Sequence, residues 1–349
     1  MRPTINIVIW AAMGQKMLIF QLVVIMAVTY FFTVIYRYYA LRNNILDLPN
    51  ARSSHSLATP RGGGCVFVIV AILSYAIFRS AAFSVADLGL FLGASVVAIV
   101  GFWDDRVSVP AKVRLCAHFA AAGCFMTGYI YSGAIAGVVD IGIPVVGVIG
   151  LVVVFIVWMT NLFNFMDGID GLAASQIIFV CTGMAIIYRW SDLFGLALLP
   201  LVLASSVIGF LIINFPPAKI FMGDAGSGFL GFVCGGLAIQ GLIAGSDFFV
   251  AWLILCGVFI VDTTLTLVVR ILRGDRFYEA HRTHAYQHAT QRFKRHSIVT
   301  IGVVTINVCW LLPWAFLVAT GTVNSLVGLF FAYFPLLMLA LKFRAGLPS

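Results

Sequence analysis

Long apolar runs, separated by short polar segments, make up almost the whole of this 349-residue chain. Each run is close to the roughly 20 residues that an α-helix needs to cross a bilayer. Backbone groups in hydrocarbon must be hydrogen-bonded within the protein, which favours helices for segments of this length. We therefore predict an all-α, polytopic integral membrane protein with about eleven transmembrane helices. Their predicted bounds are 18–40, 64–79, 85–103, 113–132, 145–163, 172–189, 194–213, 227–245, 248–270, 298–320 and 325–342.

The composition supports a membrane protein. Hydrophobic residues make up 62% of the chain and charged residues only 10%, with a mean hydropathy of +1.07. These values lie far from those of a soluble domain. No internal repeat or long polar segment is evident, so residues 1–349 are expected to form a single membrane-embedded domain. The seven cysteines lie in or beside apolar runs without CxxC spacing, and we interpret them as packing residues.

Lysine and arginine residues predict the orientation in the membrane. The loops after the even-numbered spans hold only Arg79 and Arg189. The loops after the odd-numbered spans hold Arg42, Arg52, Arg61, Arg106, Lys112, Lys219, Arg273, Arg276, Arg282, Arg292, Lys294 and Arg295. Because basic loops stay in the cytoplasm, the N-terminus is expected outside and the C-terminus in the cytoplasm. Nucleic-acid binding is not expected, since no soluble module is present to carry it.

A row of polar residues ends the fifth predicted span. Asn161, Asn164, Asp167 and Asp170 follow one another at three-residue intervals, directly after an apolar run. Side chains at this spacing drift slowly around one helix face. Charges beside hydrocarbon are costly and usually functional, so the row predicts a binding or catalytic site. The alternative is a polar helix end that reaches the lipid headgroups.

Two further acidic motifs share the predicted cytoplasmic side. Asp104 and Asp105 end the third span, and Asp224 lies in a glycine-rich segment before the eighth. The other side has only single acids, namely Asp87, Asp140, Asp192 and Asp247. We therefore expect an active site built from the cytoplasmic loops at about 41–63, 104–112, 164–171, 214–226 and 271–297. Oxygen ligands without cysteine fit Mg²⁺ or Mn²⁺, and the amides that begin the eighth span would favour a phosphate.

Four motifs in order resemble the polyprenyl-phosphate N-acetylhexosamine-1-phosphate transferase family, which is MraY/WecA-like. They are Asp104-Asp105, NLFNFMDGIDGLA from Asn161, FMGDAGSGFLG from Phe221 and HRTHAYQH from His281. The resemblance covers about residues 53–295. It implies transfer of a sugar 1-phosphate from a UDP-sugar to undecaprenyl phosphate, giving undecaprenyl-diphosphate-sugar and UMP, with Mg²⁺ as cofactor.

The resemblance is closest to the WbpL-type enzymes that initiate O-antigen synthesis. MraY-type sequences carry consecutive histidines in the last large cytoplasmic loop, whereas His281, His284 and His288 are separated here. This departure argues against a MurNAc-pentapeptide donor and leaves the HexNAc open. The implied partners are a UDP-N-acetylhexosamine donor and the undecaprenyl phosphate acceptor in the bacterial inner membrane. A homo-oligomer is neither indicated nor excluded.

The resemblance and the residue types together give the expected roles. The expected catalytic residues are Asp104, Asp105, Asp167 and Asp224, and the expected metal ligands are Asp224, Asp167 and Asn164. The expected substrate contacts are Lys112, Asn161, Asp170, Asn214, His281, Arg282, His284 and His288. A like-charged neighbour raises one pKa of the Asp104–Asp105 pair, which suits a base. Single displacement is preferred to an aspartyl-phosphate intermediate on Asp224.

Several alternatives stay open from the sequence. The three histidines would also suit a zinc site or a solvated basic loop. Asp262 lies inside the ninth span, where pairing with a neighbouring helix and a function are equally reasonable. The competing class is an ion-coupled secondary transporter, although such proteins place their carboxylates near the midplane. For a transferase we expect a cleft open to the cytoplasm, with a hydrophobic groove for the prenyl chain.

Overall fold

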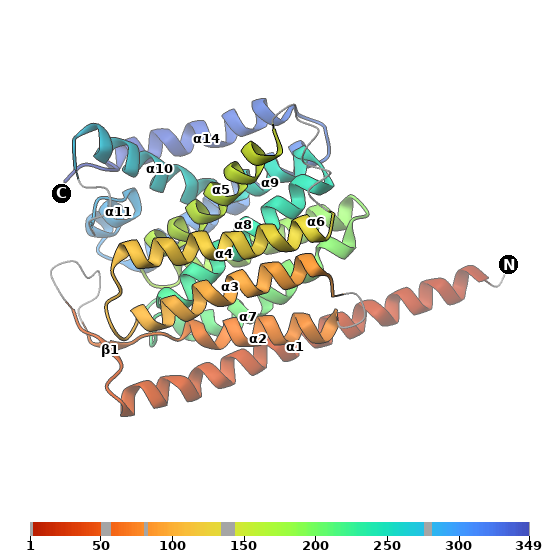
Figure 1. Ribbon diagram of the computed structural model, residues 1–349, viewed down its shortest axis with the longest axis horizontal. Coiled ribbons are helices and arrows are strands. Elements are labelled where there is room, and N and C mark those ends of the chain that lie inside the picture. The colour runs from red at the N-terminus through yellow and green to blue at the C-terminus, as the bar shows by residue number, and fades with distance from the viewer. Residues whose placement is uncertain (1–2, 50–56, 80–82, 134–143, 276–280, 349) are drawn as a thin grey trace.

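The computed structural model of the protein describes residues 3–49, 57–79, 83–133, 144–275 and 281–348 (Figure 1). The first half of the chain forms α1 (Pro3–Arg42), β1 (Leu46–Asp47), β2 (Thr59–Pro60), α2 (Gly64–Phe78), α3 (Val85–Asp104), α4 (Ala111–Tyr131) and α5 (Val145–Met166). The second half forms α6 (Leu172–Trp190), η2 (Phe194–Leu196), α7 (Leu198–Asn214), α8 (Asp224–Ala244), α9 (Ser246–Leu255), α10 (Gly257–Leu272), α11 (Ala285–Phe293), α12 (His296–Ile306), η3 (Asn307–Leu311), α13 (Leu312–Ala319) and α14 (Ser325–Lys342). β1 and β2 pair antiparallel, with Leu46 opposite Pro60.

The prediction of an all-α, polytopic membrane protein is confirmed, but the count of eleven spans is not. Within the described residues, nine helices are long and apolar enough to cross a membrane, or ten if the bent pair α9–α10 is one span. The second predicted span is the 15-residue helix α2, which is shorter than a usual crossing.

The ninth predicted span is broken, since α9 and α10 meet at 74°. Side chains donate hydrogen bonds to backbone carbonyls that lose their helical partners at the break. The Tyr333 hydroxyl donates to the Leu253 carbonyl at 2.7 Å, and Gln176 Nε2 donates to the Leu255 carbonyl at 2.8 Å. Irregular backbone at membrane depth is tolerated where the protein satisfies it in this way.

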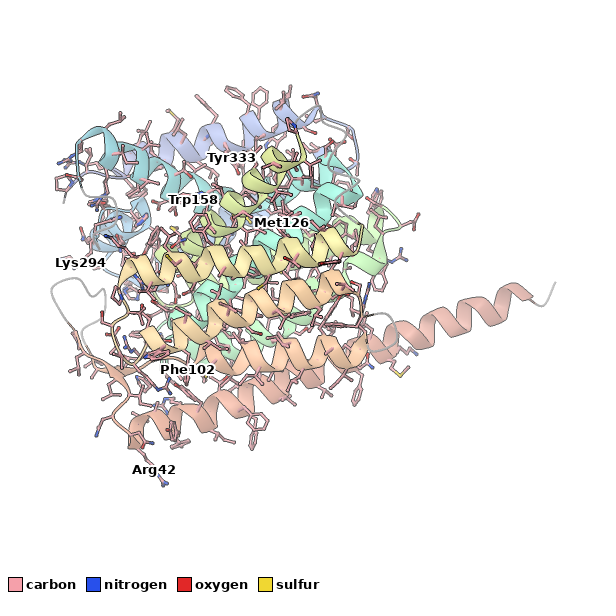
Figure 2. The ribbon with its side chains drawn as sticks, in the orientation of Figure 1. Arg42, Phe102, Met126, Trp158, Lys294 and Tyr333 are labelled. Carbon is pink, nitrogen blue, oxygen red and sulfur yellow. The ribbon has the colours of Figure 1, made fainter. Side chains whose placement is uncertain are left out.

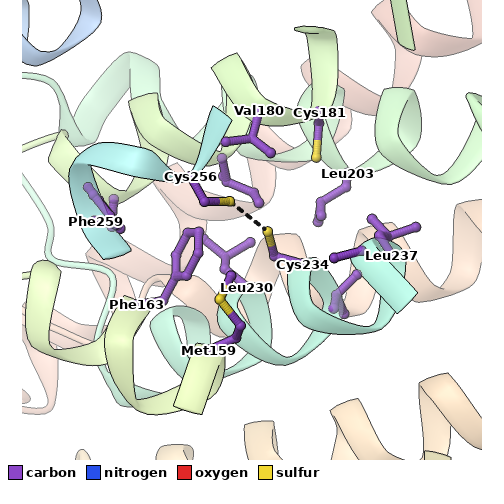
Figure 3. Close-up of a cluster of buried hydrophobic side chains, with 14 of the residues drawn as sticks. Met159, Phe163, Val180, Cys181, Leu203, Leu230, Cys234, Leu237, Cys256 and Phe259 are labelled. Carbon is purple, nitrogen blue, oxygen red and sulfur yellow. Dashed lines mark hydrogen bonds between the residues drawn. The ribbon is translucent and has the colours of Figure 1, made fainter. Parts of the chain in front are cut away.

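Helix α8 lies inside the bundle, packed between α3 and α5 (Figure 1). Small residues allow this close approach. A Cβ at Gly231 would lie 2.4 Å from the Met159 carbonyl oxygen, and one at Gly101 would lie 2.5 Å from the Asp224 backbone. Farther along α8, Cys234 packs with Cys256 in an apolar cluster, with 3.6 Å between the sulfurs (Figure 3). All seven cysteines are free thiols, and the packing interpretation holds for the buried Cys181, Cys234 and Cys256 but not for the exposed Cys116 and Cys309.

The polar loops of the predicted cytoplasmic side gather at one end of the bundle, where β1, α11 and the C-terminus lie (Figure 1). Backbone hydrogen bonds tie them together: Phe221 donates to the Pro60 carbonyl at 2.8 Å, and Gly63 donates to the Phe221 carbonyl at 3.0 Å. Parts of two predicted active-site loops lie outside the described residues, namely 50–56 with Arg52 and 276–280 with Arg276, as does Asp140. Which end faces the cytoplasm stays a prediction.

Candidate active site

Asp224 opens α8, and its carboxylate is held from two sides. Asn164 Nδ2, from the end of α5, donates to Oδ1 at 3.0 Å. Arg114 Nη1, from the first turn of α4, lies 3.1 Å from Oδ2 and also pairs with the Asp104 carboxylate at the end of α3. We call these four residues the Asp224 centre. It joins α3, α4, α5 and α8, and 34% of the Asp224 side chain is exposed and so accessible to a ligand.

Asp105 holds the backbone that presents Asp224. Its Oδ1 accepts from the Asp224 amide at 3.0 Å, and its Oδ2 accepts from the Ala225 amide at 3.4 Å. A carboxylate there satisfies free amides and complements the helix dipole. Burial raises the pKa of Asp105 above its usual value, the nearby Asp104 charge adds to this, and the two amides oppose it. The direction agrees with that expected for one member of the pair, but the contacts of Asp105 are those of a helix cap.

Gly223 makes this cap possible. Its φ of +78° lies in the region that favours glycine. A Cβ at this position would lie only 2.5 Å from Asp105 Oδ2. The glycine before Asp224 in the FMGDAGSG motif therefore allows the Asp105 carboxylate to reach the start of α8.

Asp167 follows α5 and carries an unbalanced charge. Its pKa is raised well above the usual value by burial, and repulsion from Asp224, Asp105 and Asp170 raises it further. In the described part of the chain, no hydrogen bond or ion pair to its carboxylate is seen. A cation bound beside Asp167 would relieve this repulsion.

The carboxylate and amide oxygens of this site fit a magnesium ion that takes its remaining ligands from a substrate. Among the described residues, no group of three or more His, Cys, Asp or Glu side chains could hold a metal ion by itself. Mg²⁺ commonly takes one or two carboxylates and completes its shell with water and substrate phosphates. Asp224 and Asp167 supply two carboxylates, and the Asn164 amide lies at Asp224. The donor chemistry therefore suits Mg²⁺ better than zinc.

Asp262 of α10 anchors the segment 281–288, which we call the histidine loop. Asp262 Oδ1 lies 3.2 Å from His284 Nδ1 and accepts from the Ala285 amide at 3.0 Å, and Asp262 Oδ2 accepts from the Tyr286 amide at 2.9 Å. Asp262 is buried, so these bonds fix the start of α11 firmly. Of the two alternatives left open by the sequence, the structure shows Asp262 pairing with a neighbouring element.

Two of the three histidines lie together. The rings of His281 and His284 are stacked, with centroids 5.0 Å apart. Burial lowers the pKa of His281 to about 3, so its ring is neutral at ordinary pH. The Tyr286 hydroxyl donates to the Phe165 carbonyl at 3.0 Å, which holds this loop against the end of α5 near Asp167. His288 instead lies against the C-terminal tail, with Nε2 3.0 Å from the Leu347 carbonyl oxygen.

Asp170 and Asn214 hold loops together. Asp170 Oδ2 accepts from the Ala218 amide at 3.0 Å, and Oδ1 lies 3.0 Å from His296 Nδ1. The buried Asn214 accepts from the Gly171 amide at 3.1 Å and donates to the Ile220 carbonyl at 2.9 Å. These contacts attach the loop after α5 to the loop before α8. A substrate contact by either residue stays a prediction.

The remaining predicted substrate contacts lie around the Asp224 centre or the histidine loop. Asn161 Nδ2 donates to the Val157 carbonyl at 2.7 Å and lies 3.3 Å from His118 Nδ1 of α4. Lys112 is exposed in the first turn of α4, two residues before Arg114, and Arg282 is half-buried between His281 and His284 in the chain. Their roles also stay predictions.

Arg114 is the main residue that the sequence analysis missed. It lies inside the predicted span 113–132, where an arginine is costly and usually functional, so a signal was present. Ser227, which accepts from Asn164 Nδ2 at 3.1 Å, was also missed. A serine one turn into a glycine-rich helix carries no comparable signal.

Comparisons with known proteins match the segments that form the site. A family model described as glycosyl transferase family 4 matches residues 88–242, which contain the whole Asp224 centre. The chain is 26% identical over 315 residues to the probable undecaprenyl-phosphate N-acetylglucosaminyl 1-phosphate transferase of Bacillus subtilis strain 168, covering 84% of this chain and 81% of that protein.

Two further relatives have related activities in their names. The decaprenyl-phosphate N-acetylglucosaminephosphotransferase of Mycolicibacterium smegmatis is 29% identical, with 80% of this chain and 78% of that protein covered. The phospho-N-acetylmuramoyl-pentapeptide-transferase of Chlamydia muridarum is 30% identical, with 61% and 68% covered. These similarities and the site geometry point to the same family as the four motifs.

Proposed function

This chain belongs to glycosyl transferase family 4, and from that we propose that it transfers an N-acetylhexosamine 1-phosphate from a UDP-sugar to undecaprenyl phosphate. The products would be undecaprenyl-diphosphate-HexNAc and UMP, and the step would initiate O-antigen or a related cell-envelope polysaccharide. The main support is the Asp224 centre, which gathers three charged side chains and the Asn164 amide from four helices at one end of a membrane bundle. A soluble nucleotide sugar and the phosphate of a membrane lipid can meet only at such a boundary.

The proposed chemistry is a single displacement. An oxygen of the acceptor phosphate forms a bond to the β-phosphorus of the UDP-sugar, and the bond from that phosphorus to the bridging oxygen breaks. UMP leaves with the electron pair. Both Asp224 oxygens already have partners in Arg114 and Asn164, which disfavours an aspartyl-phosphate on that side chain. In phosphoryl transfer the protein contributes mainly positioning and charge neutralisation.

Mg²⁺, with Mn²⁺ as the alternative, is the proposed cofactor, held by Asp224, Asp167 and Asn164. When bound, it would neutralise charge on the diphosphate. Asp105 keeps Asp224 in place, and Arg114 offsets part of the negative charge. A phosphate monoester has its second pKa near about 6, so the acceptor is largely ionised at neutral pH. The base assigned to the Asp104–Asp105 pair is therefore needed mainly below neutrality.

The histidine loop is proposed to bind the donor. His281 and His284 lie stacked at the start of α11, and Arg282 between them brings a positive charge. The neutral His281 suits a hydrogen bond to a sugar hydroxyl better than an ion pair. The separated histidines favour a HexNAc donor over MurNAc-pentapeptide, and this choice rests on the sequence pattern.

The proposed location is the bacterial inner membrane, with the N-terminus outside and the C-terminus and site in the cytoplasm. The support is the charge asymmetry of the loops and the position of Asp104 and Asp224 at the ends of their helices. A UDP-sugar is soluble, charged and unable to cross the bilayer, which fits a site that opens to the cytoplasm. A hydrophobic groove from the site to the membrane would hold the prenyl chain.

The test is a donor panel with purified protein in detergent. UDP-GlcNAc, UDP-FucNAc, UDP-QuiNAc and UDP-MurNAc-pentapeptide are each supplied with undecaprenyl phosphate and Mg²⁺, and released UMP is measured. We expect release with at least one UDP-HexNAc, and only when the acceptor lipid is present. UMP release that ignores the acceptor, or none with any donor, would contradict the proposal.

A further inference from the structure

An apolar cavity of about 150 Å³ lies between α10, α11, α12 and α14, behind the histidine loop. Its lining is aliphatic or aromatic apart from Asp262, whose carboxylate oxygens are already hydrogen-bonded to the start of α11. Apolar cavities of about this size stay dry and take up apolar molecules. The cavity therefore suits a hydrocarbon chain and offers nothing to a polar ligand.

The cavity reaches the outer surface of the bundle. Three of its lining residues are well exposed: Phe293 and Ile298 at 44% each, and Leu339 at 37%. Leu339 belongs to α14, a candidate membrane span, and Ile298 to the helix pair α12–α13, another such span. Hydrocarbon of the bilayer can therefore enter from the side.

Basic residues adjoin, in the chain, the two phenylalanines at the outer end of this cavity. Phe293 and Phe343, which both line it, pack with ring centroids 6.2 Å apart. Each is flanked in the chain by basic residues that are all exposed: Arg292 and Lys294 beside Phe293, and Lys342 and Arg344 beside Phe343. Arg295 follows and is also exposed. We call these five residues the basic rim.

We propose that this cavity and the basic rim bind an anionic phospholipid, with a segment of one acyl chain in the cavity and the headgroup phosphate on the rim. Basic pockets between membrane helices are known to recognise such headgroups, and each Lys or Arg near the surface contributes about 1 kcal/mol. A zwitterionic lipid would fill the cavity but gain less from the rim, because its ammonium group offsets the attraction of its phosphate. The combination of an apolar cavity and cationic mouth therefore selects an anionic lipid.

The acceptor lipid is not the expected occupant. Its phosphate must reach the Asp224 centre. The start of α11 lies near that centre, because the Tyr286 hydroxyl donates to the carbonyl of Phe165, the residue after Asn164. The basic rim lies at the other end of α11, beside Phe293, seven residues and roughly 10 Å of helix away. A phospholipid at the rim would leave the proposed reaction site open.

The bound chain would steady the histidine loop. The inner end of the cavity is lined by Ala285 and Tyr286, the two residues whose amides donate to Asp262. An acyl chain packed there supports the same turn that carries His284. This consequence for donor binding rests on the proposed function, whereas the lipid site itself does not.

The test measures lipid binding without turnover. Full-length protein purified in detergent is titrated with phosphatidylglycerol or phosphatidylcholine, and the bound lipid is counted by native mass spectrometry. We expect selective retention of phosphatidylglycerol. Replacing one rim charge, as in Arg292→Gln or Lys342→Gln, should weaken this retention about fivefold. Arg42→Gln removes a charge at the same end of the bundle but well away from Lys294 (Figure 2), and should leave retention unchanged.

A cavity-filling variant tests the apolar cavity separately from the basic rim. Gly302 lines the cavity, and a Cβ there meets no atom within 4 Å, so Gly302→Leu can be accommodated. It should abolish selective retention of phosphatidylglycerol. Gly150 of α5 is also open and exposed, so Gly150→Leu is the matched control and should retain the lipid normally.

Equal retention of the two phospholipids would overturn the proposal, as would unchanged retention in both Gly302→Leu and the rim variants. Loss of undecaprenyl phosphate binding in Gly302→Leu, with phosphatidylglycerol still retained, would assign the cavity to the acceptor and also overturn it. The rim variants change only exposed side chains, so they remain informative if Gly302→Leu does not fold. Failure of the UMP assay would leave these results unaffected.

Discussion

At the scale of single residues, the site is a set of carboxylates with too few cations. Arg114 pairs with Asp104 and Asp224, while Asp105 relies on backbone amides and Asp167 has no partner in the described residues. Neighbouring carboxylates repel one another, so the negative charge on each makes the others harder to ionise. The arrangement becomes favourable when a cation and a diphosphate enter together, which is the state that the proposed reaction requires.

Asp224→Asn keeps the shape of the side chain and removes its charge. We expect turnover to fall by about a hundredfold or more, because the loss acts on the charge that develops in transfer. UMP release measures the effect, and the elution volume shows whether the variant is folded. Asp192→Asn, which changes a carboxylate with 96% exposure at the far end of the bundle, should keep its activity. Near-normal turnover in folded Asp224→Asn would remove Asp224 from the metal site.

Asp167→Asn should separate stability from activity. The raised pKa of Asp167 means that the folded state holds its proton more tightly than the unfolded chain. In the metal-free protein, this group therefore lowers stability as pH rises from its unfolded pKa to the raised folded value. The variant should melt at a higher temperature than the wild type at neutral pH, and show a weaker loss between pH 4 and neutrality, while losing UMP release. A lower melting temperature would show that the carboxylate is stabilising and contradict the unbalanced charge.

At the scale of elements, the sequence predicted the helices better than their breaks. Hydrophobic runs gave the positions of the spans, since burial in a bilayer depends mainly on length and apolarity. No proline marks the 74° bend at Cys256 in the sequence. The backbone carbonyls freed by the bend are hydrogen-bonded by Tyr333 and Gln176, which are far away in the chain. The apolar run at 64–79 likewise predicted helix α2 and its short length, and the error was to count it among the full spans.

The acidic motifs could be placed together because their spans end on one predicted side. The sequence could not show that Asp105 caps α8, that Asp262 caps α11 or that Arg114 links two of the carboxylates. Each of these contacts joins segments whose pairing depends on helix packing. Sequence spacing carries no record of that packing.

Asp262→Ala tests the anchor of the histidine loop. Two backbone amides and His284 lose their acceptor, and each buried donor left unpaired costs about 1–3 kcal/mol. We expect a lower melting temperature together with a higher KM for the UDP-sugar. Asp87→Ala is the matched control, because Asp87 is also buried and caps α3 at the other end of the bundle. It should lower stability without changing this KM, and equal KM changes in both variants would refute a specific role for Asp262.

At the scale of the whole molecule, the acidic motifs Asp104-Asp105, Asp167 and Asp224 lie at one end of an apolar bundle. A secondary transporter would place its coupling carboxylates near the middle of the membrane, where both faces can reach them. Asp104 ends α3 and Asp224 begins α8, so both lie at the boundary. This position suits a reaction between a soluble molecule and a lipid headgroup.

Metal removal should inactivate the protein without unfolding it. Among the described residues, the donors do not form an all-protein cage, so the ion is expected to bind together with the diphosphate. EDTA should abolish UMP release, and Mg²⁺ or Mn²⁺ should restore it, with a melting temperature little changed in the absence of substrate. Full activity in metal-free buffer would contradict the proposed site.

In the proposed reaction, the sugar and the β-phosphate move together to the lipid. A UDP-HexNAc donor labelled with ³²P at the β-phosphate distinguishes this from related reactions. Purified protein is supplied with the labelled donor, undecaprenyl phosphate and Mg²⁺, and the butanol-extracted lipid is counted beside the aqueous nucleotide. We expect the label to enter the lipid in equal amount to the UMP released, and Asp224→Asn to transfer it at least about a hundredfold more slowly. Two results would contradict the proposed reaction. In one, the label remains in the aqueous phase as UDP while the sugar reaches the lipid; in the other, the label never leaves the donor.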